Sequence, residues 1–226
     1  MSVDAASIRK LVFWPAVITL GITLLRLVGE FQNWSPVFFS RAPGGGGALV
    51  GISWLPPLFA ILFAIQLVRM GLGPVSGGRA IGRALLGVAV TAAVMFGVIS
   101  LGIVQEGQVT LLSLIVMTTA LAIGAAIAWS GWPELGKTML VYAYAARIPV
   151  VVIMLLAFAG NWGTHYDGLP PGVPEMGLMK KWVMFGVLPQ MTTWIAIAVL
   201  VGGLFGSIAG TIAMRKSPPP PPTENS

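Results

Sequence analysis

Residues 139–160 read MLVYAYAARIPVVVIMLLAFAG, and Arg147 is the only charged residue among them. A helix needs about 20 predominantly apolar residues to cross roughly 30 Å of hydrocarbon. This run reaches that length only if the helix continues through Arg147. The sequence therefore predicts a membrane-spanning helix with a charge near the bilayer centre.

The composition of the whole chain agrees with a membrane location. Of its 226 residues, 56% are hydrophobic and only 9% are charged, and the mean hydropathy is +0.89. A soluble protein of this size needs more charge to cover its surface. We expect an all-α, polytopic integral membrane bundle whose transmembrane domain, 11–212, holds six spans: 11–29, 49–69, 84–104, 109–129, 139–160 and 190–212.

The basic residues predict the orientation of the bundle, because short cytoplasmic loops carry an excess of lysine and arginine. With both termini inside, eight basic residues flank cytoplasmic ends and four flank outer ends. This favours a cytoplasmic N-terminus at 1–10 and a cytoplasmic, proline-rich, disordered tail at 213–226. The pattern is typical of a bacterial inner (cytoplasmic) membrane. The eight basic residues assigned to the cytoplasmic ends are Arg9, Lys10, Arg69, Arg79, Arg83, Lys137, Arg215 and Lys216.

Several functional classes are excluded by what the sequence lacks. Cysteine is absent and His165 is the only histidine, so thiolate and histidine-rich metal sites are not expected. His165 and Asp167 together make an incomplete zinc site. No basic run with interleaved aromatics indicates nucleic acid, and no serine–histidine–carboxylate set can be assembled. We predict a non-enzymatic protein without a cofactor or metal, whose main partner is the lipid bilayer.

Arg147 allows two interpretations. It can be a packing fastener between helices, bonded to the carbonyl of Ala145, which Pro149 leaves free, and to Tyr144. Alternatively, because no carboxylate is expected at its depth, it can bind an anion in a cavity. In the second case the hydroxyls of Thr91, Thr118 and Thr119 would complete a polar midplane, together with those of Thr19 and Thr193, which lie at a similar predicted depth.

Span six carries small residues at four-residue spacing, namely Ala198, Gly202, Gly206 and Gly210. Such a glycine-zipper face lets a second helix backbone approach closely. It can pack within the six-helix bundle or form a homo-oligomer. Near the outer end of the first span, Arg26 and Glu30 are spaced to pair on one helix face.

One local resemblance is present. Residues 136–145, GKTMLVYAYA, leading into Pro149, resemble a late span of bacterial Yip1-like membrane proteins. The likeness covers about a tenth of the chain, and that family usually has fewer spans and no arginine before this proline. It implies no function for this chain.

Two functions fit these observations. The first is a non-catalytic scaffold or accessory subunit of a membrane assembly, which the glycine face and the lack of a catalytic set favour. The second is a small permease or channel with an anion-binding arginine at the bilayer midplane. A cavity that reaches Arg147 would favour the second function, and a filled bundle the first.

Overall fold

The computed structural model describes residues 3–43, 48–103, 110–170 and 173–216, and all helices and turns discussed below lie within these ranges. The predicted disordered tail from Ser217 onward lies outside them. The regular structure of the described residues is entirely helical, as the sequence predicts.

Among the residues that the structure describes, five helical segments are long and apolar enough to cross a membrane. They are α1 (Ala5–Phe31), α3 (Gly77–Ser100), α4 (Leu111–Gly131), α5 (Pro133–Gly160) and a final run, Leu178–Arg215. Their outward sides carry large apolar side chains, such as Phe13, Leu24 and Ile148. Apolar surface of this extent is stable against lipid rather than water, which indicates an integral membrane protein.

The sixth apolar helix, α2 (Leu55–Arg69), has only 15 residues. At 1.5 Å per residue it extends about 22 Å, less than the hydrocarbon thickness. The predicted span began at residue 49, but the helix starts at Leu55, with prolines in its first turn. Proline lacks a backbone N–H, and in the first turn of a helix that N–H would have no intrahelical partner, so Pro56 and Pro57 favour a helix start here. The count of six becomes five long helices and a short one.

The final run also differs from its predicted bounds. The predicted span 190–212 left residues 180–188 at the outer surface, whereas helical structure begins at Leu178. The run consists of α6 (Leu178–Lys181), η2 (Trp182–Val187), η3 (Pro189–Thr193) and α7 (Trp194–Lys216), and η2 and η3 are π-helical. The N–H of Leu188 donates to the carbonyl of Val183, and that of Trp194 to Pro189, both five residues back. This wider turn carries the chain past Pro189 without ending the helix.

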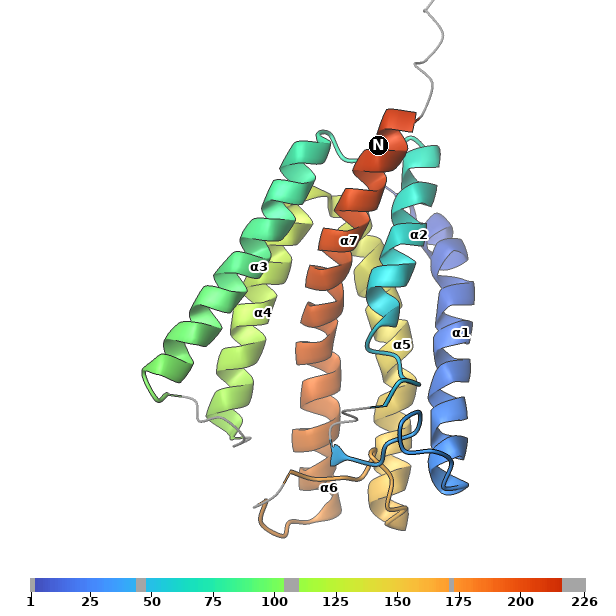
Figure 1. The fold of residues 1–226 in the computed structure, drawn as a ribbon, viewed down its shortest axis with the longest axis vertical. Helices are drawn as coiled ribbons and strands as arrows, with labels where there is room; N and C mark the ends of the chain where they lie inside the picture. The colour runs from blue at the N-terminus through green and yellow to red at the C-terminus, as the bar shows by residue number, and fades with distance from the viewer. Residues whose placement is uncertain (1–2, 44–47, 104–109, 171–172, 217–226) are drawn as a thin grey trace, which may run out of the picture.

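The helices alternate in direction between two ends (Figure 1). At the basic end, α1, α3 and α5 begin and α2 and α7 finish, which brings together the eight basic residues assigned to the cytoplasm. At the loop end, α1 and α5 finish, and the described parts of the links, 32–43, 48–54, 161–170 and 173–177, lie close to α6. α7 is central and packs against α2, α3, α4 and α5, while α1 packs on α5.

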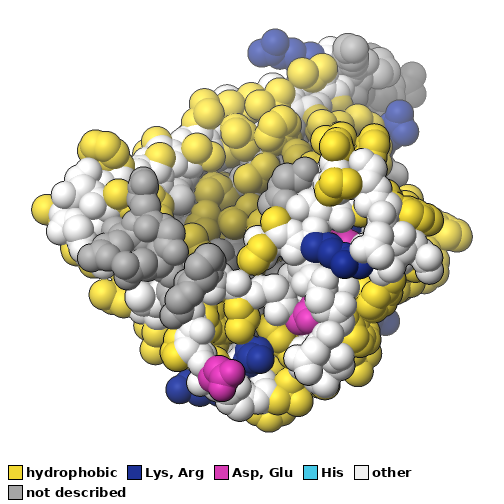
Figure 2. Space-filling model, turned by 60° about the horizontal axis from the view of Figure 1, so that its bottom comes forward, with side chains coloured by type: hydrophobic (Ala, Val, Ile, Leu, Met, Phe, Trp, Pro, Cys, Tyr) yellow, Lys and Arg dark blue, Asp and Glu magenta, His cyan; other side chains and the backbone are white. Residues whose placement is uncertain are grey.

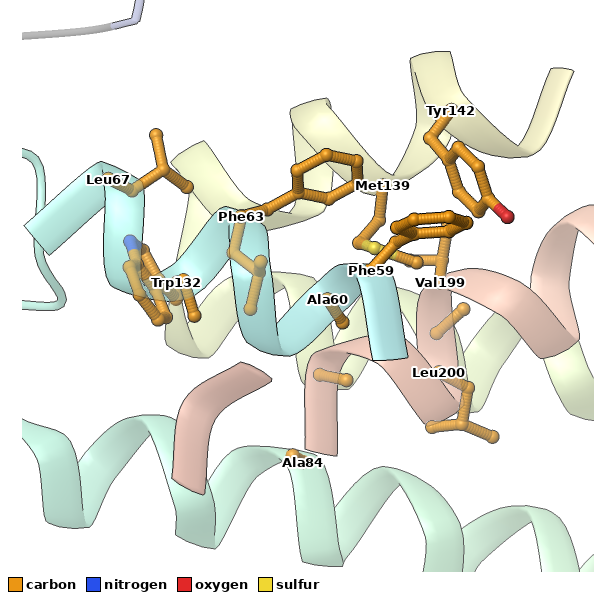
Figure 3. Packing of buried hydrophobic residues seen from close by; sticks show 14 of the residues in the cluster. Phe59, Ala60, Phe63, Leu67, Ala84, Trp132, Met139, Tyr142, Val199 and Leu200 are labelled. Carbon is orange, nitrogen blue, oxygen red and sulfur yellow. The ribbon is translucent and has the colours of Figure 1, made fainter. Parts of the chain in front are cut away.

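The half of the bundle nearest the basic end is filled by large buried side chains (Figure 3). Phe59 and Phe63 of α2 contact the ring of Tyr142, edge to face, with centroids 5.3 and 5.7 Å away. Trp132, between α4 and α5, is 1% exposed and donates its indole N–H to the carbonyl of Leu72 at 2.9 Å. Pairing the only polar atom of the indole lets the ring be buried at little cost.

The small-residue face of α7 packs inside this half of the bundle. A Cβ added at Gly202 would lie 2.3 Å from the Met139 side chain, and one at Gly210 would lie 2.4 Å from Trp132. At Gly206 it would lie 2.6 Å from Leu135. Ala198, one turn earlier, is buried with Ala143 of α5. The glycines therefore allow close packing of α7 against other parts of the same chain.

Candidate functional site

A cavity of about 330 Å³ lies in the half of the bundle nearest the loop end. Residues 51–53, which precede the start of α2 at Leu55, line it. Seen from the loop end, the surface is hollowed, and the visible walls of the hollow are mostly hydrophobic (Figure 2). The apolar side chains of the cavity include Ile52, Leu114, Met117, Val150, Met154 and Phe185. Its polar or amphipathic side chains include Thr23, Arg26, Ser53, Arg147, His165, Tyr166, Gln190 and Trp194.

Arg147 lies near the middle of α5 and is only 7% exposed. Its Nη1 donates to Oε1 of Gln190 at 2.9 Å, and its guanidinium carbon lies 4.4 Å from the centre of a Trp194 ring. Both partners are neutral. No carboxylate of the described residues lies within ion-pair distance of Arg147. A buried charge without a counter-charge is costly, so this guanidinium carries a positive potential into the cavity.

The π-helical turns bring both partners of Arg147 to the cavity. Phe185 lies in η2, Pro189 and Gln190 lie in η3, and Trp194 begins α7, and all four line the wall. Gln190 and Trp194 are four residues apart and both contact Arg147. Such turns are rare and often occur at functional sites, since they redirect side chains without breaking the helix.

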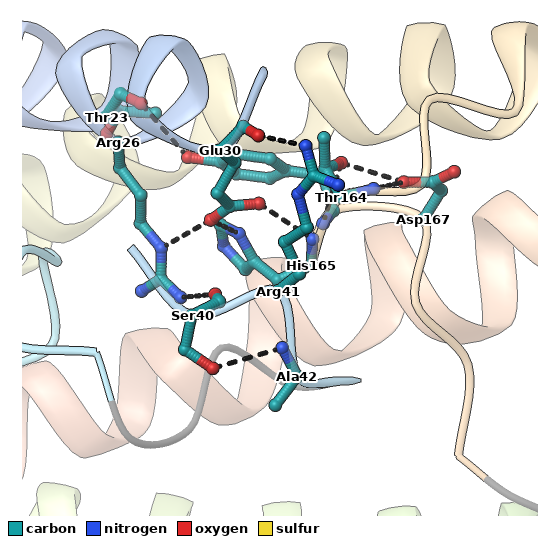
Figure 4. A network of polar contacts seen from close by, with 10 residues as sticks. Thr23, Arg26, Glu30, Ser40, Arg41, Ala42, Thr164, His165 and Asp167 are labelled. Atoms are coloured by element: carbon teal, nitrogen blue, oxygen red, sulfur yellow. Dashed lines mark hydrogen bonds and ion pairs between the residues drawn. The ribbon is translucent and has the colours of Figure 1, made fainter. Parts of the chain in front are cut away.

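Arg26 is the second arginine in the cavity wall, and its environment differs (Figure 4). Its Nε lies 2.9 Å from Oε1 of Glu30, as the four-residue spacing predicted, and its Nη2 donates to the carbonyl of Ser40 at 3.0 Å. The Arg26 side chain is 6% exposed and that of Glu30 is fully buried. The guanidinium of Arg41 donates to the backbone carbonyl of Glu30. The charge of Arg26 is therefore neutralised within the protein.

Glu30 also attaches the loop after α5 to α1. Its Oε2 accepts the backbone N–H of His165 at 2.9 Å, and Nδ1 of the His165 ring contacts Oε1. An ionised carboxylate only accepts, so the neutral ring carries its proton on Nδ1. Burial lowers the pKa of His165 below its usual value, while the hydrogen bond with Glu30 acts in the opposite direction. Burial also raises the pKa of Tyr166, whose hydroxyl donates to the carbonyl of Thr23 at 3.1 Å.

Asp167 is occupied within its own loop. Its carboxylate accepts the N–H groups of Gly163 and Thr164 at 2.9 and 2.7 Å, and the Thr164 hydroxyl at 2.7 Å. His165 faces Glu30 instead. The two residues considered for a metal site thus have separate structural roles, and both fix the loop that covers the cavity.

The structure brings only part of the predicted midplane site near Arg147. Tyr144 is 40% exposed and does not line the cavity, and the tyrosine facing the bundle is Tyr142. Thr91 is buried between α3 and α4, bonded to the carbonyls of Gly87 and Ala120. Thr118 bonds Thr193 at 2.6 Å, and Thr119 is exposed, so neither hydroxyl contacts Arg147.

Sequence reasoning missed the contacts that form the site. Gln190 and Trp194 lie more than forty residues after Arg147, and Glu30 and His165 are 135 residues apart. A glutamine inside an apolar span was the one local signal for the partner of Arg147, because an amide in lipid needs a hydrogen-bond partner.

Comparisons with known proteins give no assignment: no family model, curated protein or solved structure matches this chain.

Proposed function

We propose that this chain is a small multi-pass permease that binds an organic anion at Arg147. The observation that carries the proposal is the cavity of about 330 Å³ reaching a buried arginine with neutral partners. A cavity of this size is at the lower end of small-molecule sites. The guanidinium would attract the negative group, and no bound carboxylate would have to be displaced first.

The lining of the cavity supports an organic anion rather than an inorganic one. Most of the wall is apolar, and Met117, Val150, Met154 and Phe185 offer only dispersion contacts. A small inorganic ion would leave this surface unused. A ligand with an apolar body and one negative group would cover it and still place its charge beside Arg147 and Gln190.

Passage across the membrane requires the bundle to move. Toward the basic end, Phe59, Phe63 and Tyr142 fill the bundle and are at most 7% exposed. We propose that the π-helical turns η2 and η3, around Pro189, absorb this movement, since interrupted helices commonly line and gate transport sites.

The proposed setting is a bacterial cytoplasmic membrane with both termini in the cytoplasm. The clustering of eight basic residues at one end supports this orientation. The other candidate, a non-catalytic scaffold or accessory subunit, drew on the glycine face of α7 as a homo-oligomer surface. Because that face contacts Met139, Leu135 and Trp132 of its own chain, the permease is the better supported proposal.

A flux assay with purified protein in liposomes tests this function. Benzenesulfonate is a suitable probe, because it stays ionised and has an apolar body. We expect protein-dependent benzenesulfonate exchange that Arg147→Ala abolishes and Arg147→Lys partly preserves, since lysine keeps the charge but not the planar fork. Arg79→Ala, at an exposed arginine of the basic end, serves as the control and should exchange normally. Equal exchange by all four proteins would refute the proposal.

A further inference from the structure

A second, more apolar groove adjoins the cavity. It has a volume of about 210 Å³ and lies between α4 and η3. Leu111 and Ile115 on its edge are 52% and 54% exposed, so the groove opens on the outer, lipid-facing side of the bundle. Leu114 lines both the groove and the cavity of Arg147. The Leu114 side chain therefore lies between the outward-facing apolar groove and the cavity that holds the buried guanidinium of Arg147.

Three threonines of this groove, Thr118, Thr192 and Thr193, add little polarity to it, because their hydroxyl groups bond within the protein. The hydroxyls of Thr118 and Thr193 bond each other at 2.6 Å, and that of Thr192 donates to the carbonyl of Leu188. These hydroxyl groups are already satisfied within the protein, so the groove needs no polar ligand. What it offers a ligand is chiefly the apolar surface of its leucine and isoleucine side chains, Leu111, Leu114, Ile115 and Leu188.

We infer that the anion bound at Arg147 is a single-chain amphiphile, with its negative headgroup in the cavity and its alkyl chain passing Leu114 into this groove. The inference rests on the proposed function and specifies its substrate class. The polar end has a cation and an amide, Arg147 and Gln190, and the apolar end has a groove open toward lipid. An alkyl chain in the membrane could therefore enter sideways between α4 and η3 without crossing water.

Chain length gives the quantitative test. Each methylene buried in the groove should tighten binding by up to about fourfold, which corresponds to the transfer free energy of a methylene group. Butane-, hexane- and octanesulfonate share one headgroup and differ only in the chain. Binding of each is measured as the concentration that half-maximally raises the unfolding temperature of the protein in phosphatidylcholine nanodiscs.

Two variants fill the groove, and a third controls for partitioning into lipid. Thr119 and Ile115 are exposed residues of the groove, so Thr119→Trp and Ile115→Trp place an indole there with little burden on folding. Ile123 lies one turn after Thr119, is 46% exposed and does not line the groove. Ile123→Trp therefore reports any effect of added surface tryptophan or of sulfonate dissolved in the bilayer.

We expect wild type and Ile123→Trp to bind octanesulfonate much more tightly than butanesulfonate. Both groove variants should bind butanesulfonate as wild type does and lose most of the gain from the longer chain. The same gain in binding with chain length in all four proteins would overturn the inference. If Arg147→Ala still abolished stabilisation by the sulfonates in that case, the proposed function would stand without the groove. Undiminished octanesulfonate binding by Arg147→Ala would overturn the headgroup assignment, and no stabilisation by any sulfonate would overturn the inference outright.

Discussion

Arg26 and Arg147 line the same cavity but differ in what surrounds their charge. Arg26 is paired with the fully buried carboxylate of Glu30, whereas Arg147 has the amide of Gln190 and the ring of Trp194. In a low-dielectric interior, a paired charge contributes little net field, and a charge with neutral partners keeps most of its field. This contrast makes Arg147, rather than Arg26, the residue to which an anion would bind.

The buried imidazole of His165 should make the stability of the folded protein depend on pH. Its pKa is lowered by burial, so the unfolded chain binds more protons than the folded one near the unfolded pKa of about 6.5. Stability from this group is therefore present above that value and is lost as pH falls through the lowered folded pKa. We expect the unfolding temperature in detergent to drop between pH 7.5 and 5, and to drop less in His165→Gln.

The glutamine variant retains an N–H donor for Glu30 but has no titrating ring. Arg26, Glu30 and Asp167 surround the position in both proteins, so their contributions are common to the two curves. Parallel pH profiles for wild type and His165→Gln would show that the buried imidazole does not set this dependence.

At the scale of elements, the α3–α4 hairpin depends on contact between two glycines. A Cβ added at Gly87 would lie 2.3 Å from the backbone oxygen of Gly124, and a backbone cannot move aside as a side chain can. Gly87→Ala should therefore separate the helices and lower the free energy of unfolding by about 1–3 kcal/mol. Thermal unfolding in detergent, followed by circular dichroism, measures the loss.

Gly82, in the same helix, is the matched control, because a Cβ there meets nothing within 4 Å. Gly82→Ala should leave stability unchanged or raise it by up to about 1 kcal/mol, as expected for alanine replacing glycine in a helix. Similar losses in both variants would mean that the close approach at Gly87 is not what stabilises the hairpin.

The elements also show where sequence reasoning succeeds. The long apolar helices were predictable because a membrane demands a fixed apolar length, which is a property of composition. The starts of α2 at Leu55 and of the final run at Leu178 were not. The first depends on two prolines that fit the first turn of a helix but do not fix its starting residue, and the second on π-type hydrogen bonds that carry the chain past Pro189. Both differences concern segments that wall the cavity.

The candidate site was predictable in its central residue, Arg147, and in the Arg26–Glu30 pair, but not in the other contacts of Arg147. The unusual position of Arg147 in an apolar run identified it, because a charge there is costly. Its expected neighbour Tyr144 lies on the exposed stripe of α5 instead, with Ile148 and Val152. Spacing along a helix gives the angle between two residues but not which side faces the protein, and only packing against other helices determines that.

For the molecule as a whole, one end is filled by aromatic residues and carries the basic groups, and the other holds loops over a cavity with a buried cation. This division is compatible with the proposed permease function. The proposed function therefore depends on whether an anion reaches Arg147 in the intact bundle.

Tryptophan quenching by 4-bromobenzenesulfonate tests this most directly, because Trp194 lies 4.4 Å from the guanidinium carbon of Arg147 and bromine quenches indole emission on contact. The chain has eight tryptophans, so the emission of Trp194 is taken as the difference between wild type and Trp194→Phe. We predict that this difference is quenched with saturation, and that Arg147→Ala, which retains Trp194, loses the saturable component. Saturable quenching of equal size in wild type and Arg147→Ala would contradict the account.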